Sequence, residues 1–96
     1  MINEINITEY LKTRSENDIL VDLRSKEMFD KGTIPGAVNI PAEDVKELYK
    51  LPKDKTICLF CHIGELSGEF AELLSDSGYN VLNLVGGYRE YLRAIL

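Results

Sequence analysis

The sequence has no tryptophan, a single histidine, two cysteines and fewer basic than acidic residues. Its 11 Lys and Arg residues against 16 Asp and Glu residues give a formal net charge of −5 at pH 7. Nucleic acids and anionic membrane surfaces attract basic patches, so this charge balance argues against both as partners. The one histidine, His62, cannot build a metal site by itself, and we expect no metal ion.

Long apolar runs and an export signal are also missing. No apolar run approaches the ~20 residues that a membrane helix requires, and residues 1–6 lack the basic start and apolar core of a signal peptide. Two cysteines in a chain without such a signal are better explained as free thiols than as a disulfide framework. Because the 96 residues contain no repeat, linker or low-complexity tract, we expect one cytoplasmic domain over residues 1–96.

Short apolar segments of two kinds alternate along the chain. We expect strands around Ile5 and Ile7 and at residues 19–23, 38–40, 57–60 and 80–85. We expect helices from Thr8, from Ser25 to Gly32, at 42–49, from Ser67 to about Gly78, and at 88–95. Strands that alternate with helices form parallel sheets covered on both sides. The predicted fold class is α/β, with a mostly parallel five-stranded sheet flanked by helices on both faces.

Single residues predict details of these helices. Thr8 and Ser25 have hydroxyl side chains suited to capping a helix N-terminus. Gly32 is expected to end its helix in a left-handed conformation. The helix at residues 42–49 is expected to present one apolar face made of Val45, Leu48 and Tyr49.

Cys61 stands directly after the apolar segment 57–60, which is typical of a strand buried on both faces. A glycine-containing turn follows, and then Phe70, Leu73 and Leu74 recur at helical spacing. In an open α/β sheet, ligands bind at this carboxyl end of a strand. The loop amides and the positive end of the next helix dipole favour a thiolate there. Cys61 is therefore the candidate nucleophile.

Cys58 lies within the strand itself, so we expect a structural role for it. The spacing Cys58-x-x-Cys61 also matches a thiol redox pair. Three residues of extended strand separate the two Cα atoms by ~10 Å, whereas a disulfide needs ~7 Å or less. Only a sharp turn before Cys61 would bring the thiols together, and a redox protein that uses both cysteines stays an alternative.

Two further cysteine motifs are excluded. Cys58, Cys61 and His62 spell the attachment pattern of c-type haem, but that motif requires export and an accessible loop. A cysteine phosphatase would need an arginine six positions after the cysteine to clamp the phosphoryl group. Ser67 occupies that position.

Four blocks of sequence, in the right order, resemble the rhodanese-like domain. They are residues 21–24 (Val-Asp-Leu-Arg), 32–41 (Gly-Thr-Ile-Pro-Gly-Ala-Val-Asn-Ile-Pro), 61–67 (Cys-His-Ile-Gly-Glu-Leu-Ser) and 83–88 (Asn-Leu-Val-Gly-Gly-Tyr). The resemblance spans roughly residues 7–92. It implies sulfur-atom transfer, in which the loop cysteine holds sulfane sulfur as a persulfide and passes it to a thiophilic acceptor. It implies no metal or organic cofactor.

The resemblance also implies roles for particular residues. Cys61 would be the catalytic residue, and the substrate-binding loop would consist of His62, Ile63, Gly64, Glu65, Leu66 and Ser67. Asp22 and Arg24 close the second expected strand, and we expect an ion pair that supports this loop. The expected partners are a small sulfur donor (polysulfide or thiosulfate) or a protein persulfide, together with a thiol acceptor that can itself be a protein.

The loop departs from the pattern of the strongest sulfurtransferases in this family. Those often carry arginine directly after the cysteine and again five positions after it, where this chain has His62 and Leu66. Thr33 replaces a common histidine and Tyr91 a common tryptophan, while Glu65 adds a negative charge to the loop. These differences disfavour the dianion thiosulfate as donor. They also leave a second alternative, a catalytically weak or idle module that binds proteins or regulates them.

Overall fold

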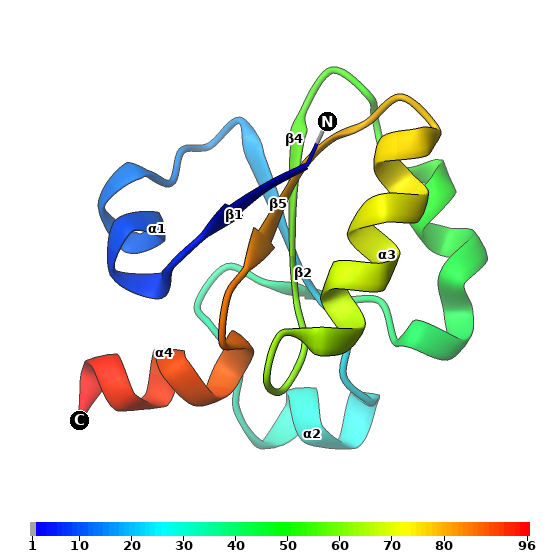
Figure 1. The fold of residues 1–96 in the computed structure, drawn as a ribbon. Helices are drawn as coiled ribbons and strands as arrows, with labels where there is room; N and C mark the ends of the chain where they lie inside the picture. Colours follow the sequence, from blue (N-terminus) through cyan, green and yellow to red (C-terminus); the bar gives the residue numbers. More distant parts are fainter. Residues whose placement is uncertain (1) are drawn as a thin grey trace.

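A parallel sheet of five strands forms the middle layer of the computed structural model, which describes residues 2–96. The strands are β1 (Ile2–Ile5), β2 (Asp18–Asp22), β3 (Val38–Asn39), β4 (Thr56–Phe60) and β5 (Asn80–Leu84). Their order in the sheet is β1-β5-β4-β2-β3, and every adjacent pair is parallel (Figure 1). The predicted α/β fold with a parallel five-stranded sheet is confirmed. A single domain over residues 1–96 stays a prediction, because residue 1 lies outside the described part.

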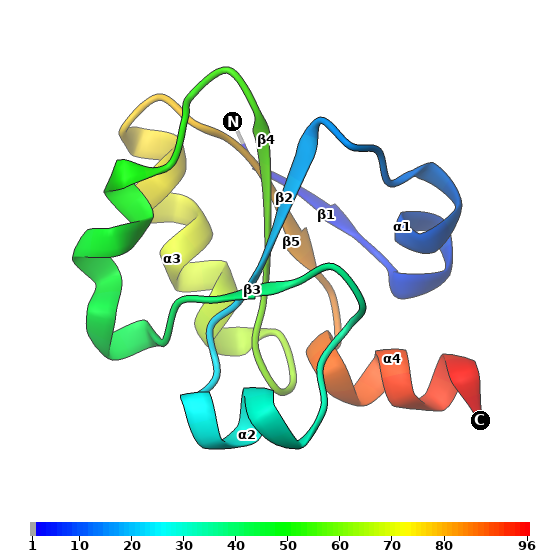
Figure 2. The same cartoon turned by 180° about the vertical axis from the view of Figure 1, so that it is seen from behind.

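Helices cover both faces of the sheet, as predicted. They are α1 (Ile7–Thr13), α2 (Lys26–Lys31), the 3-10 helix η1 (Ala42–Lys50), α3 (Glu65–Asp76) and α4 (Gly87–Ile95). Helix α3 and η1 lie on one side, and α1 and α4 lie on the other (Figures 1 and 2). Helix α2 lies beyond the carboxyl end of β2. Within residues 2–96, no helix is long and apolar enough to cross a membrane.

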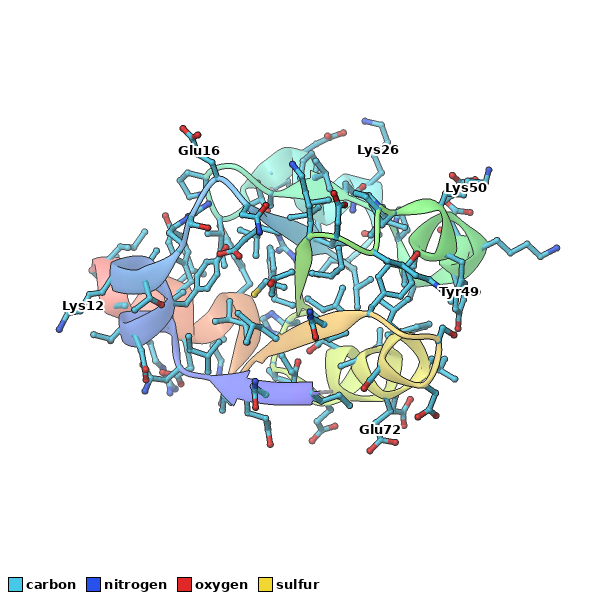
Figure 3. The ribbon with its side chains drawn as sticks, turned by 90° about the horizontal axis from the view of Figure 1, so that it is seen from above. Lys12, Glu16, Lys26, Tyr49, Lys50 and Glu72 are labelled. Atoms are coloured by element: carbon cyan, nitrogen blue, oxygen red, sulfur yellow. The ribbon has the colours of Figure 1, made fainter. Side chains whose placement is uncertain are left out.

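Strand β4 is the centre of the core. It pairs with β2 on one side and β5 on the other, and residues 57–60 are all fully buried. Ile57 and Leu59 belong to the apolar cluster beneath α3, whereas Cys58 and Phe60 belong to the cluster beneath α1. A strand with two buried faces needs apolar residues at every position, which explains the unbroken run in the sequence. The charged side chains of Lys12, Glu16, Lys26, Lys50 and Glu72 lie at the perimeter (Figure 3).

The beginning of the chain differs from the prediction in its boundaries. The first strand ends at Ile5, and Ile7 is already the first residue of α1. The N-cap is Asn6 rather than Thr8, because Asn6 has the extended backbone that a cap requires and its Oδ1 accepts a 2.8 Å hydrogen bond from Glu9 N. Both asparagine and threonine can cap a helix, so composition alone did not distinguish them.

The next two helices confirm one expectation and correct two. Ser25 caps α2 as predicted, its Oγ accepting from Met28 N. Gly32 follows α2 with a positive φ of 155°, but its ψ of 142° is extended and not left-handed helical. The 3-10 helix η1 buries Leu48, whereas Tyr49 remains 44% exposed. A 3-10 helix has three residues per turn, so Val45 and Leu48 share a face and the following tyrosine turns away from it.

Candidate active site

The loop after β4 is shorter than predicted. Helix α3 begins at Glu65 and not at Ser67, so only His62, Ile63 and Gly64 separate Cys61 from the helix. Gly64 makes this abrupt start feasible because it adopts a left-handed conformation, with φ 97° and ψ −10°. Glu65, Leu66 and Ser67 therefore form the first turn of a 12-residue helix. Their backbone N–H groups have no partner within the helix and are available to an anion.

The sulfur of Cys61 lies against this helix N-terminus. Its Sγ accepts hydrogen bonds from Gly64 N at 3.1 Å and from Ser67 N at 3.4 Å. The Ser67 Oγ lies 3.6 Å from the same sulfur. Amide donors and the positive end of the helix dipole both favour negative charge on the sulfur. The side chain is only 5% exposed, so bulk water competes little for it.

The start of α4 orients the peptide groups of the loop. Tyr88 N donates to Cys61 O at 2.9 Å, and Arg89 N donates to His62 O at 3.0 Å. The C=O and N–H of a trans peptide group point in opposite directions. Because these two carbonyls point to α4, the N–H groups of His62 and Ile63 point away from it.

Two glycines allow this close approach. A Cβ on Gly87, which has a φ of 57°, would overlap the Cys61 carbonyl and lie 2.8 Å from His62 O. A Cβ on Gly64 would lie 3.0 Å from Gly86 N. Gly87 therefore does more than turn the chain into α4: the absence of its side chain lets the helix N-terminus reach the Cys61 loop.

Ser67 connects the sulfur to β5. Its fully buried side chain donates to Asn83 Oδ1 at 2.6 Å and lies 3.1 Å from Gly64 O. Sequence reasoning included Ser67 in the site but missed Asn83. The available signal was a polar residue inside the otherwise apolar stretch Val81-Leu82-Asn83-Leu84.

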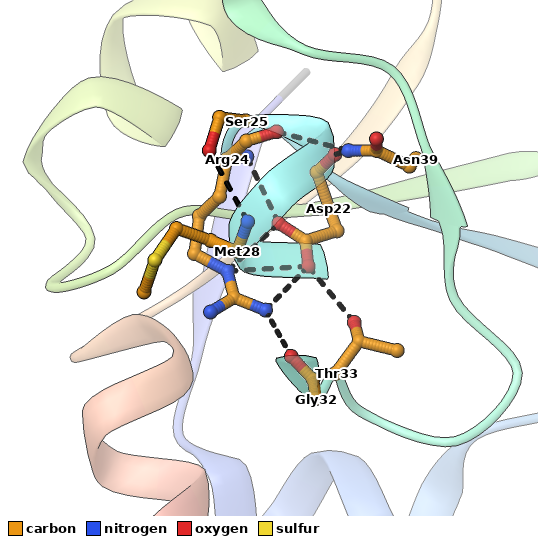
Figure 4. Close-up of polar contacts among 7 residues, drawn as sticks. All are labelled: Asp22, Arg24, Ser25, Met28, Gly32, Thr33 and Asn39. Carbon is orange, nitrogen blue, oxygen red and sulfur yellow. Dashed lines mark hydrogen bonds and ion pairs between the residues drawn. The ribbon is translucent and has the colours of Figure 1, made fainter. Parts of the chain in front are cut away.

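Asp22 and Arg24 form a buried ion pair, with Oδ2 2.7 Å from the guanidinium (Figure 4). Asp22 also accepts a hydrogen bond from Thr33 Oγ1 at 2.8 Å, and Arg24 donates to Gly32 O at 2.6 Å. The pair thus holds the segment after α2. The Arg24 guanidinium lies 4.0 Å from the centre of the Tyr88 ring, and Tyr88 contacts the Cys61 loop through its backbone. Support of the loop by this pair stays a prediction, with Tyr88 as the connecting residue.

The outer surface of the loop has no basic side chain except His62. Ile63 and Leu66 are each 40% exposed, and Glu65 is exposed beside them. In the described part of the chain, no cluster of three or more His, Cys, Asp or Glu side chains is placed to hold a metal ion. That the site works without a metal stays a prediction.

Cys58 lies in a different environment from Cys61. Both are free thiols, but Cys58 is fully buried in the cluster under α1. Burial raises the pKa of Cys58 to about 12, and the charge of Asp18 adds to this effect while Arg14 opposes it. Cys58 therefore remains a neutral thiol at physiological pH and behaves as a small apolar side chain.

Comparison with known proteins places this geometry in a family. The model of the rhodanese-like domain matches residues 7–94. A sulfurtransferase of Allochromatium vinosum is 34% identical over 97% of this chain and 91% of its own length. The thiosulfate sulfurtransferase PspE of Escherichia coli is 33% identical over 73% of this chain and 70% of its own. The crystal structure of a rhodanese-related protein from Thermoplasma volcanium superposes with a TM-score of 0.88 at 26% identity, covering 96% of this chain and 92% of that one. The chain belongs to the rhodanese-like domain family, and its relatives include sulfurtransferases.

Proposed function

We propose that this protein is a sulfurtransferase that carries sulfane sulfur as a persulfide on Cys61 and passes it to a thiophilic acceptor. One observation carries the proposal: the Cys61 sulfur accepts amide hydrogen bonds from Gly64 and Ser67 at the N-terminus of α3. A thiolate is the nucleophilic form of cysteine, and these donors stabilise it. The names of the relatives support the same reaction class.

The reaction has two displacements. In the first, the Cys61 thiolate attacks the outer sulfur of the donor, forms a new S–S bond and releases the rest of the donor with the electron pair of the broken bond. With thiosulfate the released group is sulfite, and with a polysulfide it is a polysulfide one sulfur shorter. In the second, a nucleophilic acceptor attacks the outer sulfur of the persulfide and regenerates the thiolate. No external oxidant or reductant is consumed.

The loop would stabilise the charge that the persulfide carries. The amides of Gly64 and Ser67 already donate to the Cys61 sulfur, and the N–H groups of His62 and Ile63 point away from α4, so we propose that backbone donors also receive the bound sulfur. Preorganised donors of this kind stabilise developing negative charge. The proposed roles are therefore Cys61 as nucleophile and residues 62–67 as the cradle for the transferred sulfur.

The donor is proposed to be a polysulfide or a protein persulfide in preference to thiosulfate. The Escherichia coli relative is named a thiosulfate sulfurtransferase, but the loop of this chain offers thiosulfate no permanent cation, since His62 and Leu66 occupy the positions one and five after Cys61 where related loops often carry arginine. Exposed Ile63 and Leu66 instead form an apolar rim, which suits a less hydrated donor or the surface of a protein. The acceptor is proposed to be a thiol, which can belong to a protein. The proposed location is the cytoplasm, where thiols are kept reduced as this reaction requires.

Steady-state sulfur transfer to cyanide with polysulfide as donor tests the assignment of Cys61. Cys61→Ser should abolish turnover because the oxygen cannot hold sulfane sulfur. Cys58→Ser is the matched control, because its thiol is buried away from the loop, and it should retain most of the activity if the protein remains folded by circular dichroism. Full turnover by Cys61→Ser would overturn the proposal.

The second candidate function is an idle module that binds a protein partner. The exposed apolar rim and the acidic Glu65 favour it, since neither assists a small anionic donor. An idle module would fold normally but take up no sulfur from any donor. The redox alternative requires Cys58 to ionise and reach Cys61, and its burial and raised pKa oppose this.

A further inference from the structure

The Ser67 hydroxyl has one proton and three neighbours that can accept it. These are Asn83 Oδ1 at 2.6 Å, Gly64 O at 3.1 Å and Cys61 Sγ at 3.6 Å. The shortest contact takes the proton, so Ser67 donates to Asn83. While Cys61 is a thiol, its S–H can donate to the free lone pair of Ser67 Oγ. The two hydrogen bonds then form a chain in which Cys61 donates to Ser67 and Ser67 donates to Asn83.

This arrangement conflicts with the charged form of the cysteine. A thiolate has no proton to donate, so a Ser67 lone pair facing it would be repulsive. The hydroxyl can remove the conflict by turning its proton to the sulfur. It would then leave Ser67 Oγ and Asn83 Oδ1 facing each other at 2.6 Å as two acceptors without a hydrogen between them.

The side-chain amide of Asn83 can resolve this second conflict by rotating. Its oxygen and nitrogen have nearly the same size, so a half-turn places Nδ2 against Ser67 Oγ and restores a hydrogen bond. Asn83 lines a groove together with Gly68, Glu69 and other residues. Even a Cβ on Gly68 would make only an ordinary contact with Nδ2, at 3.5 Å, so Gly68 does not hold the amide in one orientation.

We propose that Asn83 is a positioning residue that acts on Cys61 through Ser67. Its amide oxygen accepts the hydrogen bond of the Ser67 hydroxyl while Cys61 is a thiol. Its amide nitrogen donates to Ser67 Oγ once Cys61 is ionised or persulfidated. The hydroxyl is thereby freed to donate to the charged sulfur as a third donor beside the amides of Gly64 and Ser67. The proposal rests on the proposed function only in taking Cys61 as the reacting cysteine.

Other charged and titratable groups lie on the elements around this sulfur. They come from the loop, the neighbouring strands and both adjacent helices: His62, Glu65, Glu69, Glu4, Asp22, Arg24, Tyr88, Arg89 and Glu90. None of them is changed in the variants below, so their contributions cancel when the variants are compared.

A double-mutant cycle on the alkylation rate of Cys61 against pH tests the proposal. Asn83→Asp keeps the shape of the side chain, and its ionised carboxylate can only accept, so it holds the Ser67 proton away from the sulfur. It should move the pH midpoint of alkylation upward in the native background. In the Ser67→Ala background only the through-space effect of the new charge remains. The shift should then be smaller by about one pH unit, which is a tenfold change in thiolate fraction.

Equal shifts in the two backgrounds would overturn the proposal, because a charge acting only through space needs no hydroxyl. Asn80→Asp is the matched control, since Asn80 is an exposed residue at the start of the same strand. It should leave the midpoint unchanged. Alkylation is located on Cys61 by peptide mass spectrometry, and thermal melting confirms that each variant is folded.

A second measurement on the unaltered protein covers the case in which Asn83→Asp fails to fold. The side-chain NH2 protons of Asn83, observed by NMR, should be less protected from solvent exchange below the Cys61 midpoint and more protected above it, with protection measured against the base-catalysed exchange of a free amide at the same pH. Protection that does not change through that midpoint would overturn the proposal. Failure of sulfur uptake by Cys61 would instead refute the proposed function, since neither the cycle nor the NMR measurement requires a sulfur donor.

Discussion

Replacing Leu66 by arginine should convert the loop into a better site for thiosulfate. Leu66 is in the first turn of α3, one residue before Ser67, and is 40% exposed, so a longer side chain there can extend from the Cys61 loop without displacing core residues. A charge-assisted hydrogen bond contributes about 1.5–3 kcal/mol. Because the site is partly exposed, solvent screening favours the lower end of this range. Since ~1.4 kcal/mol is a factor of ten, kcat/KM for thiosulfate should rise roughly tenfold.

The assay is sulfur transfer to cyanide, with thiosulfate and polysulfide compared on Leu66→Arg, Leu66→Gln and the native protein. Leu66→Gln adds polarity without a charge and should give little of the gain. Polysulfide turnover should rise less, because its charge is more diffuse. The gain with thiosulfate should also shrink as ionic strength increases. Native thiosulfate turnover equal to that of Leu66→Arg would show that backbone amides suffice, and the reasoning from missing arginines would fall.

Two further predictions concern the loop contact and the buried ionisable groups. Gly87→Ala should abolish most sulfur transfer because the new Cβ would overlap the Cys61 carbonyl. It should also lower the stability against urea more than Gly78→Ala does, because Gly78 shares a positive φ but a Cβ there would meet only Lys53 Nζ at 3.8 Å. Equal losses of stability and activity in the two variants would refute this. Burial raises the pKa of both Tyr10 and Cys58 to about 12. In the unfolded chain both groups ionise at lower pH, so the free energy of unfolding should fall as pH rises from about 9 to 12. Tyr10→Phe should reduce that fall, as read from urea midpoints at pH 8 and 10.5; an unchanged slope would contradict the assigned burial effect.

The strands were predictable because their signal is local. Residues 57–60 had to be apolar throughout once β4 was placed in the middle of a covered sheet. Cys58 could likewise be assigned to the core, since it lies within that run. The position of Cys61 at the end of the same strand indicates the site from the sequence alone.

The features that were missed depend on backbone conformation or on contacts distant in sequence. The early start of α3 follows from the left-handed backbone of Gly64, which no periodicity of apolar residues reveals. Asn83 bonds to a side chain 16 residues away, and Gly87 makes room for a carbonyl 26 positions earlier. Such contacts become visible only when β4 and β5 lie side by side.

The most direct test of the account is the mass of the native protein after incubation with polysulfide. One added sulfur, removed by a reductant and mapped to the peptide containing Cys61, is the predicted result. Cys58→Ser should gain the same sulfur, and Cys61→Ser should gain none. Uptake that persists in Cys61→Ser, or no uptake by the native protein from any donor, would contradict the persulfide carrier proposed here.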